Sequence, residues 1–280
     1  MHSLPKPTLS AEEVFKLSIS KVSDLDLKSR LEACIPVVVR DSMEYDVKAV
    51  QALLHQIPKS AVVNGNVTGN EMIAVYEQRM VNKNGPGRPY YEQLRKPTDD
   101  DNCPFCGQLP IKTLDHYLAK TDYPSLVVSP SNLVPACRDC NSVKNATSPT
   151  KSEEAILHPY FDNIDNEQWL FARVLRTSPA SLSFYIDPPS HASSVLAERV
   201  KYHFRVFQLN TLYKSEAATE FRNISFQMRK LLKSGGSNAV KQQLLDRAES
   251  SLQVRLNSWR TAMYQALAQD KWYCSEGAAI

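Results

Sequence analysis

Apolar residues recur at helical spacing through the first third of the chain. A Ser-x-x-Glu capping box at Ser10 and a Thr-x-x-Glu box at Thr68 each precede an apolar stripe and predict two helix starts. Ser23 and Asp46 are expected to begin two further helices between them. Such stripes are the buried faces of packed helices. We therefore assign residues 1–96 to an N-terminal helical region.

In the last part of the chain, the spacing of apolar residues changes from a helical pattern to a strand-like one and back. Residues 169–175 and 182–186 are two strand-like runs separated by a short polar turn, which predicts a β-hairpin. A Gly-Gly pair within residues 234–237 predicts a break in the helical pattern that follows. The periodicity predicts three helices, at residues 193–209, 212–232 and 238–268. Residues 151–280 are thus expected to be a C-terminal hairpin and helical region that docks substrate or a partner.

Composition narrows the class of protein. With 280 residues, 42% of them hydrophobic and 22% charged, the chain is typical of soluble globular proteins. The first residues, MHSLPKPTLSAEE, lack the apolar stretch of a secretory signal, and no apolar run is long enough to span a bilayer. Four of the six cysteines fall in two Cys-x-x-Cys pairs, which favours a reducing compartment. We expect a cytoplasmic protein with no membrane partner.

One segment is strongly basic, although the net charge of the chain is only +3. Residues 199–233 carry eight Lys or Arg against two Glu, with aromatic residues interleaved: Tyr202, Phe204, Tyr213 and Phe221. This pattern permits binding along a phosphate backbone. It equally describes a solvated basic face over a packed aromatic core. Base stacking requires exposed rings, which a sequence does not show, so the solvated face is the interpretation we favour.

The two cysteine pairs, Cys103/Cys106 and Cys137/Cys140, predict a metal site. A single Cys-x-x-Cys is also the pattern of a redox dithiol. Two such pairs in one short segment favour four thiolates around a structural zinc ion. The ion would close a segment that has few apolar residues of its own.

The sequence between and after these pairs alternates strand and helix patterns. Residues 113–117 are expected to form a strand, residues 132–136 its partner, and residues 137–145 a turn that leads into a helix. This order brings four polar residues together: Asp115, His116, Asn132 and Asn141. Each alone is explained by local hydrogen bonds, a turn or a helix cap. Together, with three of them between the two cysteine pairs and Asn141 directly after the second pair, they predict a functional site.

The whole segment resembles the HNH endonuclease superfamily, in its variant with two Cys-x-x-Cys pairs. The resemblance covers residues 103–144 and rests on six matching elements: Cys103/Cys106, Asp115-His116, Asn132-Leu133, Cys137/Cys140, Asn141 and Lys144. It implies a ββα-metal core with structural zinc within residues 97–150. The expected fold class is therefore α+β, mostly α, with helical regions on both sides of that core.

The resemblance also implies roles for the four polar residues. Asp115 would bind a catalytic divalent metal, and His116 would be the general base that takes a proton from water. Asn132 would position the His116 imidazole and the hairpin. Asn141 would be the second metal ligand, at a position where many members have histidine. An amide oxygen is a harder ligand than imidazole, so we expect Mg²⁺ or Mn²⁺ there. Three basic residues are assigned to nucleic-acid contacts: Lys144, Lys120 and Arg138.

We therefore expect a metal-dependent endonuclease that hydrolyses DNA. Its layout, a short core between helical arms, resembles the nuclease subunit of Septu-type anti-phage systems, which implies an ATPase partner. The chain has no Gly-x-x-x-x-Gly-Lys-Ser/Thr loop, so an ATPase would have to act in trans. The alternative is a non-catalytic zinc module that binds nucleic acid or protein, with no second metal site and no cleavage.

Overall fold

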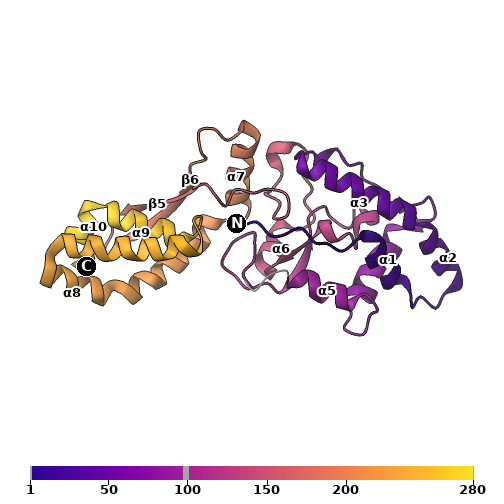
Figure 1. Ribbon diagram of the computed structural model, residues 1–280, viewed down its shortest axis with the longest axis horizontal. Coiled ribbons are helices and arrows are strands. Elements are labelled where there is room, and N and C mark those ends of the chain that lie inside the picture. Colours follow the sequence, from indigo (N-terminus) through magenta and orange to yellow (C-terminus); the bar gives the residue numbers. More distant parts are fainter. Residues whose placement is uncertain (1, 97–100, 280) are drawn as a thin grey trace. The chain divides into compact units, whose positions relative to one another are not determined.

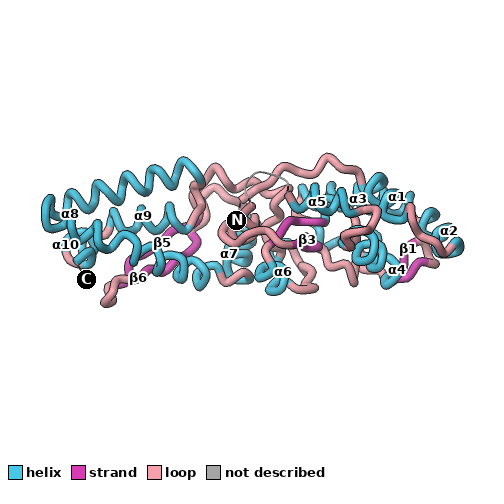
Figure 2. The backbone as a smooth tube through the Cα atoms, turned by 90° about the horizontal axis from the view of Figure 1, so that it is seen from below, coloured by secondary structure: helices cyan, strands magenta, loops and turns pink. Residues whose placement is uncertain are grey.

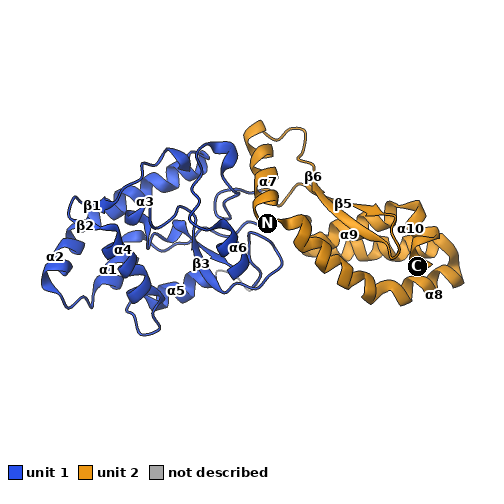
Figure 3. Ribbon diagram, turned by 180° about the vertical axis from the view of Figure 1, so that it is seen from behind, with its two compact units in different colours: residues 1–163 blue, residues 164–280 orange. Residues whose placement is uncertain are grey.

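The computed structural model describes residues 2–96 and 101–279 and divides into two compact units, residues 1–163 and 164–280 (Figure 3). The fold is mixed α+β and mostly helical, as expected. Its strands form short antiparallel pairs (Figure 2). None of the helices in the two described stretches is long and apolar enough to cross a membrane.

The first unit is built from helices and two short antiparallel strand pairs (Figure 1). Its strands are β1 (Val62–Val63), β2 (Val67–Thr68), β3 (Thr113–His116) and β4 (Leu133–Ala136). Its helices are α1 (Ala11–Ile19), α2 (Leu25–Ala33), α3 (Ile35–Val50), α4 (Gly69–Ala74), α5 (Arg88–Arg95) and α6 (Arg138–Lys144), with a π-helical turn at Val75–Val81. Leu114 of β3 and Leu133 of β4 belong to the same apolar core as Phe15, Val38 and Met80. The core therefore fixes the hairpin that carries the candidate site.

The local signals in this unit predicted two helix starts correctly and missed two others. The N-cap of α2 is Asp24, one residue after the expected Ser23. Capping boxes form at Ser10 and Thr68, as predicted. The prediction of a helix start at Asp46 is wrong, because α3 already begins at Ile35. Pro36 in its first turn supplies a helical φ, and burial of the apolar face of α3 stabilises the helix across a run of β-branched residues that disfavour it locally.

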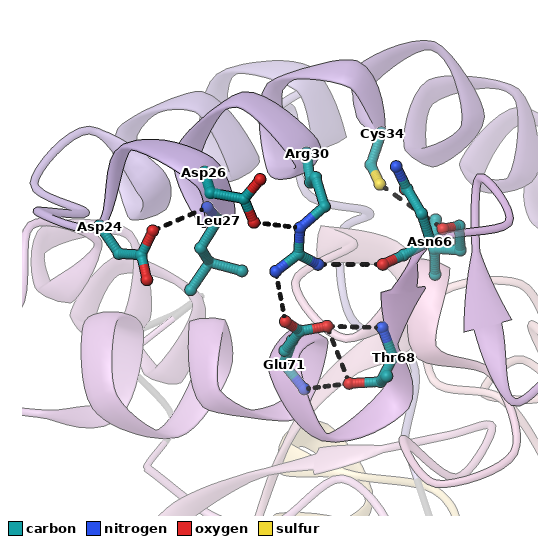
Figure 4. Close-up of polar contacts among 9 residues, drawn as sticks. Asp24, Asp26, Leu27, Arg30, Cys34, Asn66, Thr68 and Glu71 are labelled. Atoms are coloured by element: carbon teal, nitrogen blue, oxygen red, sulfur yellow. Dashed lines mark hydrogen bonds and ion pairs between the residues drawn. The ribbon is translucent and has the colours of Figure 1, made fainter.

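Arg30 joins three elements of the first unit (Figure 4). Its guanidinium donates to Asp26 Oδ2 within α2 at 2.8 Å and to the carbonyl of Asn66, between β1 and β2, at 2.9 Å. The third contact, also 2.8 Å, is to Glu71 Oε1 in α4. The other oxygen of Glu71 accepts from Thr68 in the capping box. One side chain thus ties α2 to the β1–β2 hairpin and to the first turn of α4.

The second unit combines the predicted hairpin with helices. Its elements are β5 (Leu170–Leu175), β6 (Ser181–Ile186), α7 (Ser194–Val206), α8 (Leu209–Val254), α9 (Trp259–Gln269) and α10 (Lys271–Ser275). The predicted break falls inside α8 at Gly236, whose φ of 67° and ψ of −168° interrupt the helix. The prediction of one helix over residues 238–268 is wrong. Arg255 is extended, and Ser258 caps α9 by accepting from the Thr261 amide.

The first compact unit runs to Asn163. It therefore includes the first residues of the expected C-terminal region, which we took as residues 151–280 after residues 1–96 and 97–150. Tyr160 donates to the Leu133 carbonyl at 2.9 Å, and the His158 Nε2 lies 2.8 Å from the Tyr45 hydroxyl. These contacts fix the segment that follows α6 on the hairpin and on α3. The expected start of the central core, residues 97–100, lies outside the described residues.

Candidate metal centre and catalytic site

The four paired cysteines converge as the sequence predicted. Cys103, Cys106, Cys137 and Cys140 are buried and free of disulfides, and their sulfur atoms all lie within 4.8 Å of one another. Four thiolates about 2.3 Å from a tetrahedral zinc ion would stand roughly 3.8 Å apart. Four convergent sulfur atoms within this distance therefore fit a structural zinc ion as a donor set.

Backbone amides already point at two of these sulfurs. The Leu109 amide donates to Cys106 Sγ at 3.4 Å, and the Cys140 amide donates to Cys137 Sγ at 3.3 Å. Gly107 turns the first knuckle with a φ of 69°, a value that glycine adopts without strain. Cys137 is the N-cap of α6, so the helix dipole also favours a thiolate there. Such outer contacts orient ligands and stabilise their charge.

His116 is the last residue of β3, and its imidazole is held by the backbone. Nε2 lies 2.8 Å from the Val127 carbonyl, which can only accept, so Nε2 carries the hydrogen. Nδ1 is then unprotonated, and no described residue is hydrogen-bonded to it. The Tyr76 ring packs edge-on at 4.4 Å between centroids. Burial lowers the pKa of His116 to about 3, so the ring is neutral at physiological pH and offers a lone pair at Nδ1.

Asn132 acts on the loop that follows β3. It is fully buried; its Oδ1 accepts from the Leu118 amide at 2.7 Å, and its Nδ2 donates to the carbonyls of Leu118 and Leu126 at 3.1 and 3.2 Å. Val127, which holds His116, is the next residue along. Asn132 does not contact the imidazole. Instead, Asn132 fixes the two ends of the loop whose Val127 carbonyl bonds to the His116 imidazole.

Asp115 forms a buried ion pair that the sequence did not predict. Its Oδ2 lies 3.1 Å from Lys144 Nζ, and both side chains are only 4% exposed. The same ammonium donates to the His116 carbonyl at 2.6 Å. Burial raises the pKa of Asp115 to about 6, an effect that the positive charge of Lys144 partly offsets. Lys144 therefore ties α6 to the end of β3.

The remaining predicted residues lie in different environments. Asn141 precedes Lys144 by three residues and so shares its face of α6; its side chain makes no hydrogen bond to a described residue. Lys120 forms a 2.5 Å ion pair with Glu77. Arg138 is exposed at the first residue of α6. Lys144 thus contacts the Asp115 carboxylate and the His116 backbone carbonyl, Asn132 holds the loop that contains Val127, and Arg138 faces solvent.

Two parts of this arrangement have no signature in the sequence. The Val127 carbonyl lies in a loop without periodicity, and a backbone acceptor leaves no trace in residue type. The spacing of Lys144 and Asn141 predicts that they share one face of α6. The ion pair of Lys144 with Asp115, however, depends on how α6 packs on β3. Both follow from tertiary structure alone.

Comparison with known proteins gives two relatives. The chain is 27% identical to protein ea31 of Escherichia phage lambda over 291 aligned residues, which cover 97% of this chain and 98% of that protein. It is 28% identical to the Septu protein PtuB of Bacillus thuringiensis over 113 residues, or 38% of this chain and 43% of that protein. No family model and no solved structure matches. The second similarity and the four-cysteine cluster fit the resemblance to Septu-type proteins.

Proposed function

We propose that this protein is a metal-dependent endonuclease of the HNH type that hydrolyses DNA phosphodiester bonds. The observation that carries the proposal is the His116 imidazole, neutral and fixed through Nε2, at the end of the same strand that carries the buried Asp115. Both residues lie at the end of a β3–β4–α6 unit that the four cysteines close. The order of two strands and a helix supports the ββα-metal core that we propose.

Each residue then has a defined task. His116 accepts a proton from the attacking water at Nδ1, because Nε2 is already committed to Val127. Asn132 keeps that carbonyl in place. Asp115 and Asn141 would hold Mg²⁺ or Mn²⁺, with water completing the coordination. The bound cation would supply positive charge to the phosphate and the leaving 3′ oxygen.

The biological setting of the proposal rests on the comparisons. Similarity to the Septu protein PtuB supports a role in anti-phage defence with an ATPase partner, and we place that role in the cytoplasm. Of the three basic residues assigned to DNA, Arg138 is exposed and makes no ion pair with a described residue, so we propose it as the phosphate contact beside the site. Lys144 instead acts inside the protein on Asp115.

One observation favours the non-catalytic alternative. The Lys144 ammonium already compensates the charge of Asp115, and a carboxylate that is neutralised in this way attracts a metal ion less strongly. In that case the unit would be a zinc-stabilised module that binds nucleic acid or protein. Metal binding at Asp115 therefore separates the two functions.

The first test is nicking of supercoiled plasmid by the zinc-loaded protein in Mg²⁺ or Mn²⁺. We expect His116→Ala to lower the rate by at least about a hundredfold, since it removes the general base. His191→Ala is the matched control, because His191 is exposed and pairs with Glu167 in the second unit. Equal nicking by the wild type and His116→Ala would overturn the assignment of the base.

The second test is calorimetric titration of the zinc-loaded protein with Mn²⁺. If the protein is the proposed nuclease, the wild type should bind one Mn²⁺ ion in addition to zinc, and Asp115→Ala should not bind it. The zinc module requires zinc at one equivalent and no Mn²⁺ binding in either protein. This measurement decides between the functions even if cleavage depends on a partner.

A further inference from the structure

The first half of α8 presents a basic face with an aromatic ring at its centre. Arg222, Phe226, Arg229, Lys230 and Lys233 follow one another at steps of four, three, one and three residues, so they lie on one side of the helix. All five are exposed, and Phe226 is 73% exposed. The face belongs wholly to the second unit.

No negative charge balances this face. None of its four basic residues makes an ion pair with a described residue, and the face is completed by polar residues such as Thr219 and Asn223. The nearest carboxylate along the helix, Glu220, is engaged by other groups: its side chain is 15% exposed, lies 3.7 Å from Arg247, contacts the Tyr264 hydroxyl and accepts from Asn223 at 3.4 Å. The cations are therefore available to an external polyanion.

Phe226 supplies the exposed aromatic ring that base stacking requires and that the sequence of the basic segment could not show. Stacking on a base requires an exposed ring, and Tyr213, one of the aromatic residues noted in the sequence, is buried at 2%. Phe226 stands in solvent between Arg222 and Arg229. An isolated phenyl ring in this setting contributes little to folding, whereas bases can stack on it.

A pocket adjoins the same face. Its volume is about 460 Å³, and Arg222 and Arg229 line it together with Lys214. Phe221 and Tyr273 provide aromatic lining. Pockets of this size and mixed apolar and polar lining are typical of small-molecule sites. The two arginines thus belong both to the face that carries the exposed ring and to the lining of a pocket with apolar walls, which suits a strand whose phosphates and bases alternate.

We propose that this face of α8 binds single-stranded DNA, with phosphates on Arg222, Arg229, Lys230 and Lys233 and an unpaired base on Phe226. A duplex hides the faces of its bases, so the ring favours a single strand. The choice of DNA over RNA rests on the proposed nuclease function. The alternative occupant of a basic face, an acidic protein, gains nothing specific from a stacking ring.

The test is fluorescence anisotropy of a short labelled single strand with the full zinc-loaded chain and no added Mg²⁺ or Mn²⁺. We expect Phe226→Leu, which keeps apolar area but not the ring, to weaken binding by about fivefold or more. Phe226→Trp should bind at least as tightly as the wild type. Equal affinity of Phe226→Leu and the wild type would overturn the proposal.

Salt dependence tests the phosphate contacts independently. Each contact to a single strand contributes about 0.7 to the slope of log K against log salt concentration, so Arg222→Gln with Arg229→Gln should reduce that slope by about 1.4. Lys241→Gln, an exposed lysine after the Gly236 break in α8, is the matched control and should leave it unchanged. An unchanged slope in the arginine double variant would contradict the assignment.

Three competitors decide the ligand. The proposal requires the labelled strand to resist displacement by duplex DNA of the same sequence, by the RNA equivalent and by poly-glutamate. Equal or better competition by any of them overturns the choice of single-stranded DNA, and poly-glutamate would then indicate an acidic protein. No cleavage takes place in these binding assays, so the two proposals can fail separately. If the wild type cuts DNA and the Phe226→Leu variant binds the single strand as tightly as the wild type, this inference is refuted and the proposed nuclease function stands.

Discussion

Lys144 shows how burial changes the meaning of a residue. Its place in the motif indicated a phosphate contact, yet its ammonium lies 3.1 Å from Asp115 Oδ2 and 2.6 Å from the His116 carbonyl. At 4% exposure the pair is removed from water. When one partner of a buried ion pair is deleted, the other is left as an uncompensated charge, which costs more than the pair itself contributes.

We therefore predict that Lys144→Met lowers the free energy of unfolding by about 3–5 kcal/mol. Adding Asp115→Asn should recover much of the loss, because the unpaired carboxylate is then gone. Lys120→Met is the control: its pair with Glu77 is partly exposed and should be worth at most about 1 kcal/mol. Denaturant unfolding in the presence of zinc measures all four proteins. If Lys144→Met and Lys120→Met are equally mild, Lys144 is not a buried counter-ion.

At the scale of elements, the junction of α2, α4 and the β1–β2 hairpin is sensitive to pH. The hydrogen bond from Arg30 lowers the pKa of Glu71 to about 2, from a usual value of 4.5. A carboxyl group whose pKa is lower in the folded state than in the unfolded state stabilises the fold, and this contribution is complete at pH values above the unfolded-state pKa. That contribution is lost as the pH falls from about 4.5 toward 2.

Glu71→Gln should therefore flatten the acid dependence of stability in this pH window, while lowering stability at neutral pH. The measurement is the denaturant midpoint as a function of pH. Glu32→Gln serves as the control, since Glu32 is exposed on α2 and makes no ion pair with a described residue. Identical pH profiles for both variants would show that the Arg30–Glu71 contact seen in Figure 4 contributes nothing in solution.

Elements with local signals were the ones that the sequence predicted well. Residues close together in the sequence determine the capping boxes, the strand pattern around Asp115 and the cysteine spacing. The start of α3 at Ile35 and the end of α8 before Trp259 depend on burial against distant segments, which overrides local propensity. The same holds within the site. Residue types marked His116 as a candidate site residue, whereas its hydrogen bond to Val127 required the folded loop.

At the scale of the whole molecule, the two proposed activities fall in different units. The cysteines, Asp115 and His116 all lie within residues 1–163, and the basic face of α8 lies within residues 164–280. Each unit has an apolar interior of its own, with Trp169, Tyr213 and Met263 buried in the second. Loss of the zinc ion should therefore act on one unit and spare the DNA-binding face of the other.

Cys140→Ala tests this separation. Binding of a structural metal contributes directly to folding, so the variant should lose its zinc, and amide hydrogen exchange should rise throughout the segment that the ion closes. Residues 164–280 should keep their protection, and the affinity for a single DNA strand should not change. Cys274→Ala, a buried cysteine of the second unit, should retain one zinc ion per chain. Elemental analysis and exchange mass spectrometry measure both variants. A loss of protection that spreads equally over both units would show that they unfold as one.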